Sequence, residues 1–157
     1  MNDLVPSGEN KTASAASTTT GTNIEIDITV QNGSDVDIDL DTELTKHDAI
    51  VLYFTMWCPI CNGHADKMIA KVMPSYSNVG FYLVDYVSGS TSSSQISLVS
   101  SGYQNAGVTL LVDLAREIEL KYDGTMGTTI VIDADGNILM NEDFKDGVLL
   151  SSILSGL

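Results

Sequence analysis

The stretch YFTMWCPIC, residues 53–61, decides the fold of this chain. Its first letters belong to an uninterrupted apolar run, AIVLYF (49–54), which is typical of a strand buried on both faces. Pro59 follows shortly after this run, and proline is favoured at the first position of a helix. We therefore predict a buried strand that passes directly into a helix, with Cys58 at the helix N-terminus and Cys61 one turn further along.

The spacing of the two cysteines suits reversible disulfide chemistry. Unpaired N–H groups and the helix dipole favour a thiolate at a helix N-terminus, so Cys58 is the predicted nucleophile and Cys61 the resolving thiol. Trp57 and Pro59 are predicted to contact a partner chain. A stabilising disulfide without turnover and metal binding by the pair alone are alternatives. A disulfide that closes so small a loop removes little chain entropy, which disfavours a purely stabilising role. No second Cys/His pair supplies further ligands, so neither a metal site nor a cofactor is predicted.

Periodicity on either side of this stretch predicts alternating strands and helices. Ile24–Val30 and Val36–Asp41 alternate apolar with polar residues, and the Asn32-Gly33 turn joins them into an N-terminal β-hairpin. The other predicted elements are helices over 42–47, 59–72, 95–105, 113–121 and 146–155, strands over 49–54, 79–85, 108–112, 128–133 and 137–141, and a flexible loop over 88–94. This order predicts an α/β fold with a central mixed β-sheet flanked by helices.

Composition limits the functions that the chain can have. Its 157 residues, 43% of them apolar, are enough for one domain with a proper core. The 21 acidic and 7 basic residues give a net charge of −14, which disfavours nucleic acid and basic-patch membrane contacts. No apolar run approaches the ~20 residues needed to span a bilayer. The aspartates of DVDIDLD (35–41) resemble a calcium ladder, but on an edge strand they are expected to face water and oppose aggregation.

The N-terminal segment differs from the rest of the chain. Residues 1–22 include TASAASTTTGT (12–22) and are predicted to be a disordered Ser/Thr-rich tether before a folded domain over 23–157. The start, MNDLVPSGEN, has neither a basic nor an apolar region, so no signal peptide is expected there. Such tethers often join a lipid anchor or signal segment to an exported domain. The segment is therefore consistent with an exported domain, with a lipoprotein as one form; an unstructured chain end without a role is the alternative.

Two motifs carry a resemblance to a known family. The residues IVLYFTMWCPIC (50–61) and GTTIVIDADGNIL (127–139), with Tyr122 before the second, resemble the thioredoxin superfamily. Within it, the chain looks most like the TlpA-like and ResA-like exported reductases and their AhpC/TSA relatives. The resemblance implies a thioredoxin-like fold and a periplasmic or cell-surface location. It also implies a thiol–disulfide oxidoreductase whose CxxC pair exchanges with protein thiols and disulfides and is served by an upstream redox protein. A monomer is expected.

The sequence departs from that family at three places. Gly127 stands where the family carries a cis-proline, so the Met126–Gly127 bond is expected to be trans. The loop formed with Thr128, which is the predicted docking site for a partner chain, should therefore be less rigid and more open. Leu52 replaces the buried aspartate that thioredoxins place before the first cysteine, and His64 replaces a glutamate that follows the second cysteine in the exported reductases.

His64 is the candidate proton carrier. It lies one helical turn from Cys61, and an imidazole can accept a thiol proton near neutral pH; an exposed histidine without a role is the alternative. Thr55 has the spacing to Cys58 that peroxiredoxins use, but Val51 occupies the position of their matching proline. Two alternatives to an oxidoreductase therefore remain. One is a non-catalytic thioredoxin-like binding module that carries a partner or a metal, and the other is a peroxiredoxin-like thiol peroxidase.

Overall fold

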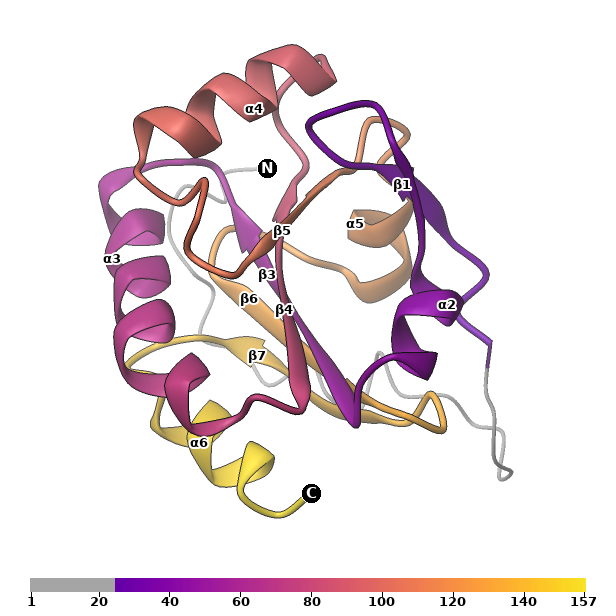
Figure 1. Ribbon diagram of the computed structural model, residues 1–157, viewed down its shortest axis with the longest axis vertical. Coiled ribbons are helices and arrows are strands. Elements are labelled where there is room, and N and C mark those ends of the chain that lie inside the picture. The colour runs from indigo at the N-terminus through magenta and orange to yellow at the C-terminus, as the bar shows by residue number, and fades with distance from the viewer. Residues whose placement is uncertain (1–24) are drawn as a thin grey trace.

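A seven-stranded mixed sheet forms the centre of the computed structural model, which describes residues 25–157 (Figure 1). The strand order is β2-β1-β5-β4-β3-β6-β7, in which β3, β4 and β5 are parallel and the other neighbours are antiparallel. The strands are β1 (Thr29–Gln31), β2 (Asp37–Asp39), β3 (Ala49–Thr55), β4 (Val79–Asp85), β5 (Thr109–Val112), β6 (Thr128–Asp133) and β7 (Ile138–Asp143). The predicted α/β class, mixed sheet and N-terminal hairpin are confirmed. The predicted tether over 1–22 lies outside the described residues.

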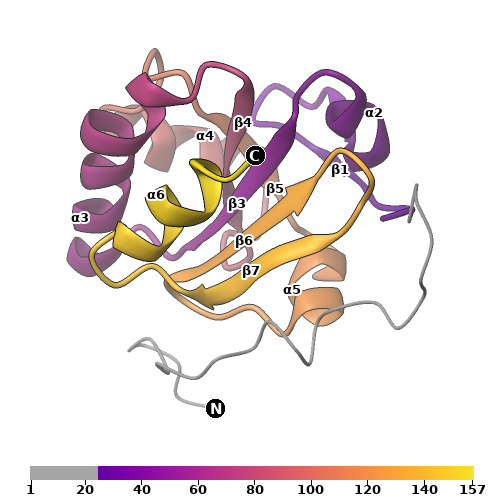
Figure 2. The same cartoon turned by 90° about the horizontal axis from the view of Figure 1, so that it is seen from below.

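Helices cover both faces of the sheet (Figure 2). The helical elements are α2 (Leu40–Thr45), α3 (Pro59–Lys67), the π-helical turn η1 (Met68–Val72), the 3-10 turn η2 (Met73–Ser75), α4 (Thr91–Ser100), α5 (Glu117–Tyr122) and α6 (Val148–Leu154). The apolar residues of α3, η1, α4 and α6 pack on one face, and those of α2 and α5 pack on the other.

Alternate side chains of β3 point into these two apolar cores. Val51 and Tyr53 belong to the core beneath α3 and α6, whereas Ile50, Leu52 and Phe54 belong to the core beneath α2 and α5. All five side chains are fully buried, as the apolar run in the sequence predicts. The loop that follows β3 therefore starts from a strand that is packed on both faces.

The N-terminal hairpin is shorter than predicted. Only Thr29–Gln31 pairs with β2, because Asp27 has a left-handed φ of 56° and takes the preceding backbone out of the ladder. Ile26 remains buried, and the Asp41 carboxylate accepts hydrogen bonds from the N–H groups of Ile26 and Asp27, each at 2.8 Å. Asp41 is therefore a structural acceptor rather than a side chain that only faces water. Ile24, the first residue of the predicted strand, lies outside the described residues.

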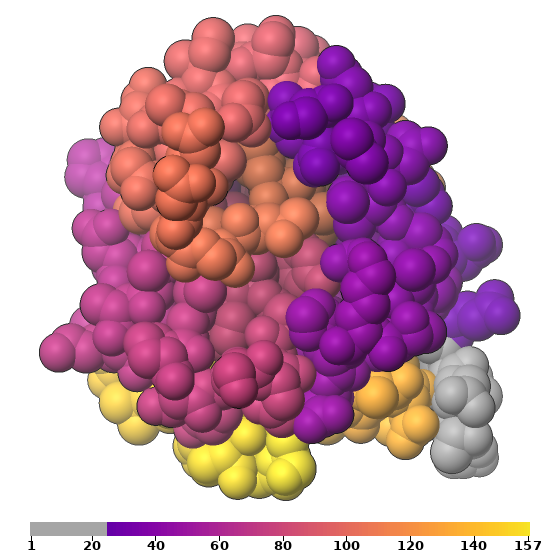
Figure 3. Space-filling model, in the orientation of Figure 1, coloured from indigo at the N-terminus to yellow at the C-terminus, as the bar shows by residue number. Residues whose placement is uncertain are grey.

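The acidic hairpin lies at an edge of the sheet, as predicted, because β2 is the outermost strand on that side. Asp39 at its end caps α2, and its Oδ2 accepts a hydrogen bond from the Thr42 N–H at 3.2 Å. In the space-filling view, the hairpin and α2 form one side of the molecule, opposite the side formed by α3 (Figure 3). The strongest concentration of negative charge in the sequence is therefore remote from the helix that begins at the cysteines.

The prediction of a flexible loop over 88–94 is partly wrong. Helix α4 begins at Thr91, inside that segment, because Ser90 is its N-cap. The Ser90 Oγ accepts a hydrogen bond from the Ser93 N–H at 3.1 Å. A run of serines that resembles a flexible linker in the sequence thus begins a helix, since serine is a favoured capping residue.

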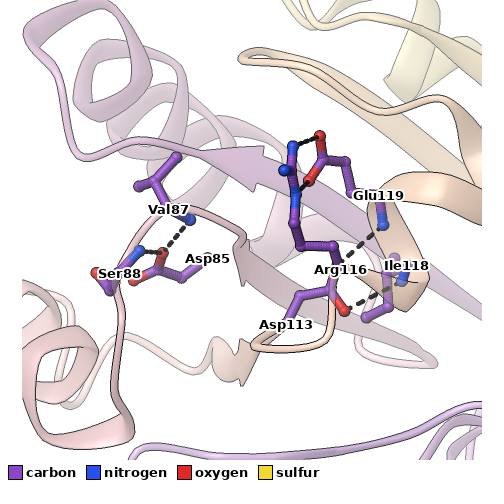
Figure 4. A network of polar contacts seen from close by, with 7 residues as sticks. All are labelled: Asp85, Val87, Ser88, Asp113, Arg116, Ile118 and Glu119. Atoms are coloured by element: carbon purple, nitrogen blue, oxygen red, sulfur yellow. Dashed lines mark hydrogen bonds and ion pairs between the residues drawn. The ribbon is translucent and has the colours of Figure 1, made fainter.

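Helix α5 begins later than predicted, at Glu117 rather than at Asp113. The Asp113 carboxylate remains outside the helix and accepts hydrogen bonds from the N–H groups of Ile118 and Glu119, at 3.1 and 2.9 Å (Figure 4). Arg116 has a left-handed φ of 60° at the helix start and binds Glu119 through two hydrogen bonds of 2.6 Å. A buried carboxylate cap therefore sets this boundary.

Candidate active site

The two cysteines lie at the C-terminal end of β3, where the chain turns into α3. Cys58 is the N-cap residue of α3, and its Sγ accepts a hydrogen bond from the Cys61 N–H at 3.4 Å. The two Sγ atoms are 3.2 Å apart, and both cysteines are free. Cys58 is half-buried, whereas Cys61 is fully buried. The arrangement therefore offers one sulfur to a partner and keeps the second directly behind it.

The surroundings of Cys61 protect its thiol. Burial raises the pKa of Cys61, and the neighbouring Cys58 raises it further. The Met56 N–H donates a hydrogen bond to the Cys61 Sγ at 3.4 Å, which acts in the opposite direction without reversing the net rise. Cys61 is therefore the protected member of the pair, and it must lose a proton before it can attack.

Limited alkylation of the reduced protein is expected to modify Cys58 before Cys61. The Cys58 sulfur is partly accessible, whereas 0% of Cys61 is exposed, and an alkylating agent must reach the sulfur atom. Peptide mass mapping after brief treatment with iodoacetamide at about pH 6 measures the order of labelling. Preferential labelling of Cys61 would reverse the assignment of the two sulfurs.

Trp57 is held in a strained backbone conformation next to Cys58. Its φ of 64° lies in the left-handed region, which costs a non-glycine residue of order 1 kcal/mol or more. Thr55 Oγ1 accepts a hydrogen bond from the Trp57 N–H at 2.9 Å, and Asp85 accepts one from the indole Nε1–H at 2.8 Å. Both ends of the residue are therefore fixed, and β3 and β4 together set the position of the indole.

Asp85, the last residue of β4, is a fully buried carboxylate that ties this part of the site together. Its Oδ1 accepts hydrogen bonds from the N–H groups of Val87 and Ser88, at 3.0 and 2.9 Å (Figure 4). Its Oδ2 accepts them from the Trp57 indole and from Ser94 Oγ, the latter at 2.6 Å. Burial raises the pKa of Asp85, but the hydrogen bonds from Ser88, Ser94 and Trp57 outweigh burial and hold the pKa below its ordinary value.

The loop before β6 places a third sulfur beside the dithiol. Met126 Sδ lies 3.2 Å from Cys58 Sγ, and the methionine side chain is buried. Gly127 has a φ of 88°; its N–H donates to the Phe54 carbonyl at 3.0 Å, and its carbonyl accepts from the Phe144 N–H at 2.9 Å. No cis peptide bond occurs in residues 25–157, so the predicted trans Met126–Gly127 bond is confirmed. The thioether occupies the space that the absence of proline was expected to open.

The residues predicted to contact a partner chain differ in accessibility. Trp57 is half-buried and Pro59 is exposed, and both are neighbours of Cys58 in the chain. Met126 and Gly127 are buried. Thr128 is also fully buried, and its Oγ1 accepts a hydrogen bond from the Thr125 N–H at 3.0 Å. Access to the dithiol is therefore from the side of the α3 N-terminus.

His64 contacts a tyrosine that lies in the same core as Cys61. Its Nδ1 lies 2.7 Å from the Tyr53 hydroxyl, and its ring lies 4.9 Å from the ring of Phe144. Tyr53 is fully buried and belongs to the same apolar core as Cys61. Burial, followed by the effect of Cys61, raises the pKa of Tyr53, so the phenol keeps its proton. Tyr53 is therefore a candidate link between Cys61 and His64, in place of the direct step that the sequence predicted.

The histidine itself is half-buried rather than exposed. Burial lowers the pKa of His64, Asp143 on β7 raises it, and Lys67 on α3 lowers it; the net pKa is below the ordinary value. His64 is therefore a neutral base at neutral pH and can accept a proton.

Comparisons with known proteins identify the fold. No protein-family model matches the sequence, and no curated protein matches it. A thioredoxin-like protein from Aeropyrum pernix superposes with a TM-score of 0.68 at 13% identity, over 83% of this chain and 89% of that chain. The fold is thioredoxin-like. Two further solved structures agree. They are a secreted Mycobacterium tuberculosis disulfide oxidoreductase homologous to E. coli DsbE (TM-score 0.62, 20% identity, 83% of this chain and 96% of that chain) and the thioredoxin domain of a Bacteroides vulgatus thiol-disulfide oxidoreductase (TM-score 0.65, 14% identity, 88% and 98%).

Two groups of this thioredoxin-like site were not predicted from the sequence. Leu52 faces the core on the α2 side, whereas the next residue, Tyr53, faces the other core, which also contains Cys61. Strand alternation places Tyr53 on a single face but does not say which face α3 covers. Asp85 pairs directly with Thr55 in the parallel register of β3 and β4. A carboxylate that ends a buried strand was a signal available in the sequence, because parallel strands end at the same edge of a sheet.

Within residues 25–157, no group of three or more His, Cys, Asp and Glu side chains is placed to hold a metal ion. None of the helices in this range is long and apolar enough to cross a membrane.

Proposed function

We propose that this protein is a thiol–disulfide oxidoreductase that exchanges its Cys58–Cys61 pair with protein thiols and disulfides. The proposal rests on one observation: two free sulfurs lie 3.2 Å apart at the N-terminus of α3, and only Cys58 is accessible. Solved proteins of the same fold that are described as thiol-disulfide oxidoreductases support it. An oxidised partner would be reduced, and the dithiol would become a disulfide.

The reaction has two balanced steps. The Cys58 thiolate attacks one sulfur of a partner disulfide, which forms a mixed disulfide and releases the first partner thiolate to take up a proton. Cys61 then loses its proton and attacks the Cys58 sulfur, which breaks the mixed disulfide and releases the second partner thiolate. Two electrons pass to the partner, and an upstream redox protein must return them for turnover. The reverse sequence oxidises a partner dithiol.

The structure supports a route for the proton that Cys61 must lose. When His64 carries its hydrogen on Nε2, its Nδ1 accepts a hydrogen bond from Tyr53, and the phenol oxygen is free to accept the Cys61 S–H. During attack, the Cys61 proton passes to the Tyr53 oxygen while the Tyr53 proton passes to His64. Tyr53 ends unchanged, His64 ends as an imidazolium, and Cys61 acts as the thiolate.

Replacing Tyr53 with phenylalanine is expected to slow the resolving step about tenfold or more, since positioned acid–base groups usually contribute more than this to a rate. The substitution removes the hydroxyl that lies 2.7 Å from His64 Nδ1 and that is proposed to connect it with Cys61, and it keeps the ring in the core. Stopped-flow absorbance with substoichiometric Ellman's reagent separates the loading of Cys58 from the later release of thionitrobenzoate by Cys61. Only the second phase should slow.

The control for this variant is Tyr82→Phe. Tyr82 is also buried, but its hydroxyl donates to Glu43 at 2.8 Å on the other face of the sheet. His64→Ala should slow the same phase, and adding Tyr53→Phe to it should slow it no further. Because the pKa of His64 lies below its ordinary value, the wild-type release rate should remain high at neutral pH and fall as the pH drops through that lowered pKa. Equal release rates in wild type and Tyr53→Phe would exclude the relay.

Catalysed reduction of insulin by dithiothreitol tests the proposed function. The wild-type protein should accelerate insulin precipitation, and a variant with serine at both cysteine positions should not. A wild-type rate equal to that of the double variant would instead favour a non-catalytic binding module. The peroxidase alternative receives little support, because the hydroxyl of Thr55 accepts a hydrogen bond from the Trp57 N–H.

We also propose that the protein acts outside the cytoplasm as a monomer. The support is the Ser/Thr-rich composition of residues 12–22 and the likeness in fold to a disulfide oxidoreductase that is described as secreted. Protein thiols and disulfides are the proposed substrates, and nucleic acid is not a proposed partner because the net charge is −14.

A further inference from the structure

Three sulfur atoms meet at the N-terminus of α3. Cys58 Sγ lies 3.2 Å from Cys61 Sγ and 3.2 Å from Met126 Sδ, so the three sulfurs form one cluster with Cys58 in contact with both of the others. Two of the three side chains are almost completely buried, Cys61 at 0% and Met126 at 1% exposed. Disulfide exchange uses the two thiols and gives the thioether no chemical step. The position of Met126 therefore has no explanation in the proposed reaction.

The fold holds the methionine where it is. The adjacent Gly127 has a left-handed φ of 88° and is bound on both sides, to the carbonyl of Phe54 and to the N–H of Phe144. On the other side of Met126, the Thr125 N–H donates to Thr128 Oγ1 at 3.0 Å, and the Thr128 N–H donates to the Thr125 carbonyl at 2.9 Å. The loop is thus anchored to the end of β3 and to the residue after β7. This anchored loop holds the buried thioether in place beside Cys58.

The chemistry of the three donors selects the ion. Thiolates and thioethers are soft ligands and favour Cu(I), whereas zinc in proteins is held by thiolate, imidazole and carboxylate groups. Within residues 25–157, no third His, Cys, Asp or Glu side chain joins the two cysteines in a group that could hold a metal. Among the described residues, the further sulfur donor beside the pair is the thioether of Met126. Zinc would therefore lack a complete ligand set, while Cu(I) would have three sulfurs.

We propose that the reduced protein binds one Cu(I) ion through the sulfurs of Cys58, Cys61 and Met126. Binding releases the two thiol protons, and the resulting thiolates are stabilised by the N–H groups of Cys61 and Met56, each 3.4 Å from a sulfur. Methionine has three rotatable bonds and adjusts to an ion between the sulfurs. The ion enters and leaves on the side of Cys58, which is the accessible member of the cluster.

This site does not depend on exchange activity, because it uses the dithiol only as a ligand. Bound Cu(I) and the disulfide exclude each other, since both use the same two sulfurs. Whether or not the metal-free protein catalyses insulin reduction, that result does not test the Cu(I) site. Likewise, the result of a Cu(I) titration does not test exchange activity.

Competition for Cu(I) under anaerobic conditions tests the site. The reduced wild-type protein is titrated with Cu(I) in the presence of the chromophoric chelator bathocuproine disulfonate, and one equivalent per chain should bind. Met126→Leu conserves volume and removes only the thioether. It should weaken binding at least about tenfold, the lower end of what loss of a supporting group alone costs a metal site. Met140→Leu is the matched control, because Met140 is equally buried but lies on β7 and should bind as the wild type does.

X-ray absorption at the copper edge of the wild-type complex counts the sulfur ligands directly and does not depend on how well any variant folds. Three sulfur scatterers are expected in wild type and two in Met126→Leu. A two-sulfur site in wild type, or equal affinity in wild type and Met126→Leu, would overturn the proposal.

Discussion

Replacing Cys58 with serine is expected to abolish disulfide exchange, whereas replacing Cys61 with serine should stop the reaction after its first step. Cys58 carries the accessible sulfur, and Cys61 lies behind it with no exposed surface. Without Cys58 no mixed disulfide can form, so insulin reduction should fall to the background rate. Without Cys61 the mixed disulfide forms at Cys58 but has no sulfur 3.2 Å away to resolve it, so it should accumulate. Non-reducing electrophoresis with mass spectrometry detects that adduct.

The two variants control for each other, because each removes one sulfur from the same pair. Melting temperatures should be close in both, since serine is only slightly smaller than cysteine. The assignment of roles fails if the stable adduct forms on Cys61 in Cys58→Ser, or if Cys58→Ser keeps a measurable share of the wild-type rate.

Replacing Asp85 with alanine is expected to lower the free energy of unfolding by about 3 kcal/mol, the largest stability effect of any substitution in the site. The carboxylate is fully buried and accepts four hydrogen bonds, from Val87, Ser88, Trp57 and Ser94. Alanine leaves these donors without the acceptor that the fully buried carboxylate provides. Urea unfolding followed by far-UV circular dichroism measures the change.

The pH dependence of this effect has a definite sign. The pKa of Asp85 is lower in the folded than in the unfolded protein, so its stabilisation is present above the unfolded value and is lost as the pH falls through the folded value. The difference in free energy of unfolding between wild type and Asp85→Ala should therefore become smaller at acidic pH. Asp48→Ala is a suitable control, because Asp48 is exposed and its carboxylate accepts one hydrogen bond, from Asn78. If Asp85→Ala lowers the free energy of unfolding as little as Asp48→Ala does, that result would contradict the structural role of Asp85.

Asp85→Ala also tests the position of Trp57. The indole loses its acceptor at 2.8 Å, and only the Thr55 hydroxyl still holds the strained backbone. Fluorescence of Trp57 should shift to longer wavelength, because the freed ring becomes more hydrated. The shift is easy to assign, since the chain has a single tryptophan.

The sequence predicted the central strands well because their signals are local. Both 79–85 and 128–133 were predicted with the bounds that the structure has for β4 and β6. The passage from β3 into α3 followed from an apolar run and Pro59 alone. These features depend on residues that are neighbours in the chain, which is the information a sequence contains most directly.

The boundaries that were wrong depend on side-chain hydrogen bonds. Ser90 starts α4 within a segment that resembles a linker, and Asp113 delays the start of α5 by capping it from outside. Asp41 bonds the backbone at Ile26, fifteen residues away in the chain. Periodicity of apolar residues carries no information about such bonds.

The site was predicted as far as its parts are adjacent in sequence. The cysteine pair, Trp57 and His64 were proposed from the sequence, but the tyrosine that contacts His64 was not, because a buried tyrosine in an apolar run looks like core. The sequence indicated an opening next to the dithiol at Gly127. The structure fills it with Met126, whose direction depends on the backbone at Gly127 and on two strands far apart in the chain.

The central claim is that Cys58 and Cys61 form a reversible redox pair, and equilibration with glutathione buffers of graded potential tests it most directly. Trp57 fluorescence reports the state of the pair, and mass spectrometry after acid quenching counts the thiols. We predict a single reversible transition between dithiol and intramolecular disulfide, with the two-electron slope of about 30 mV per tenfold change in ratio. Cysteines that remain thiols across the series, or that carry only glutathione without forming the Cys58–Cys61 disulfide, would contradict the claim.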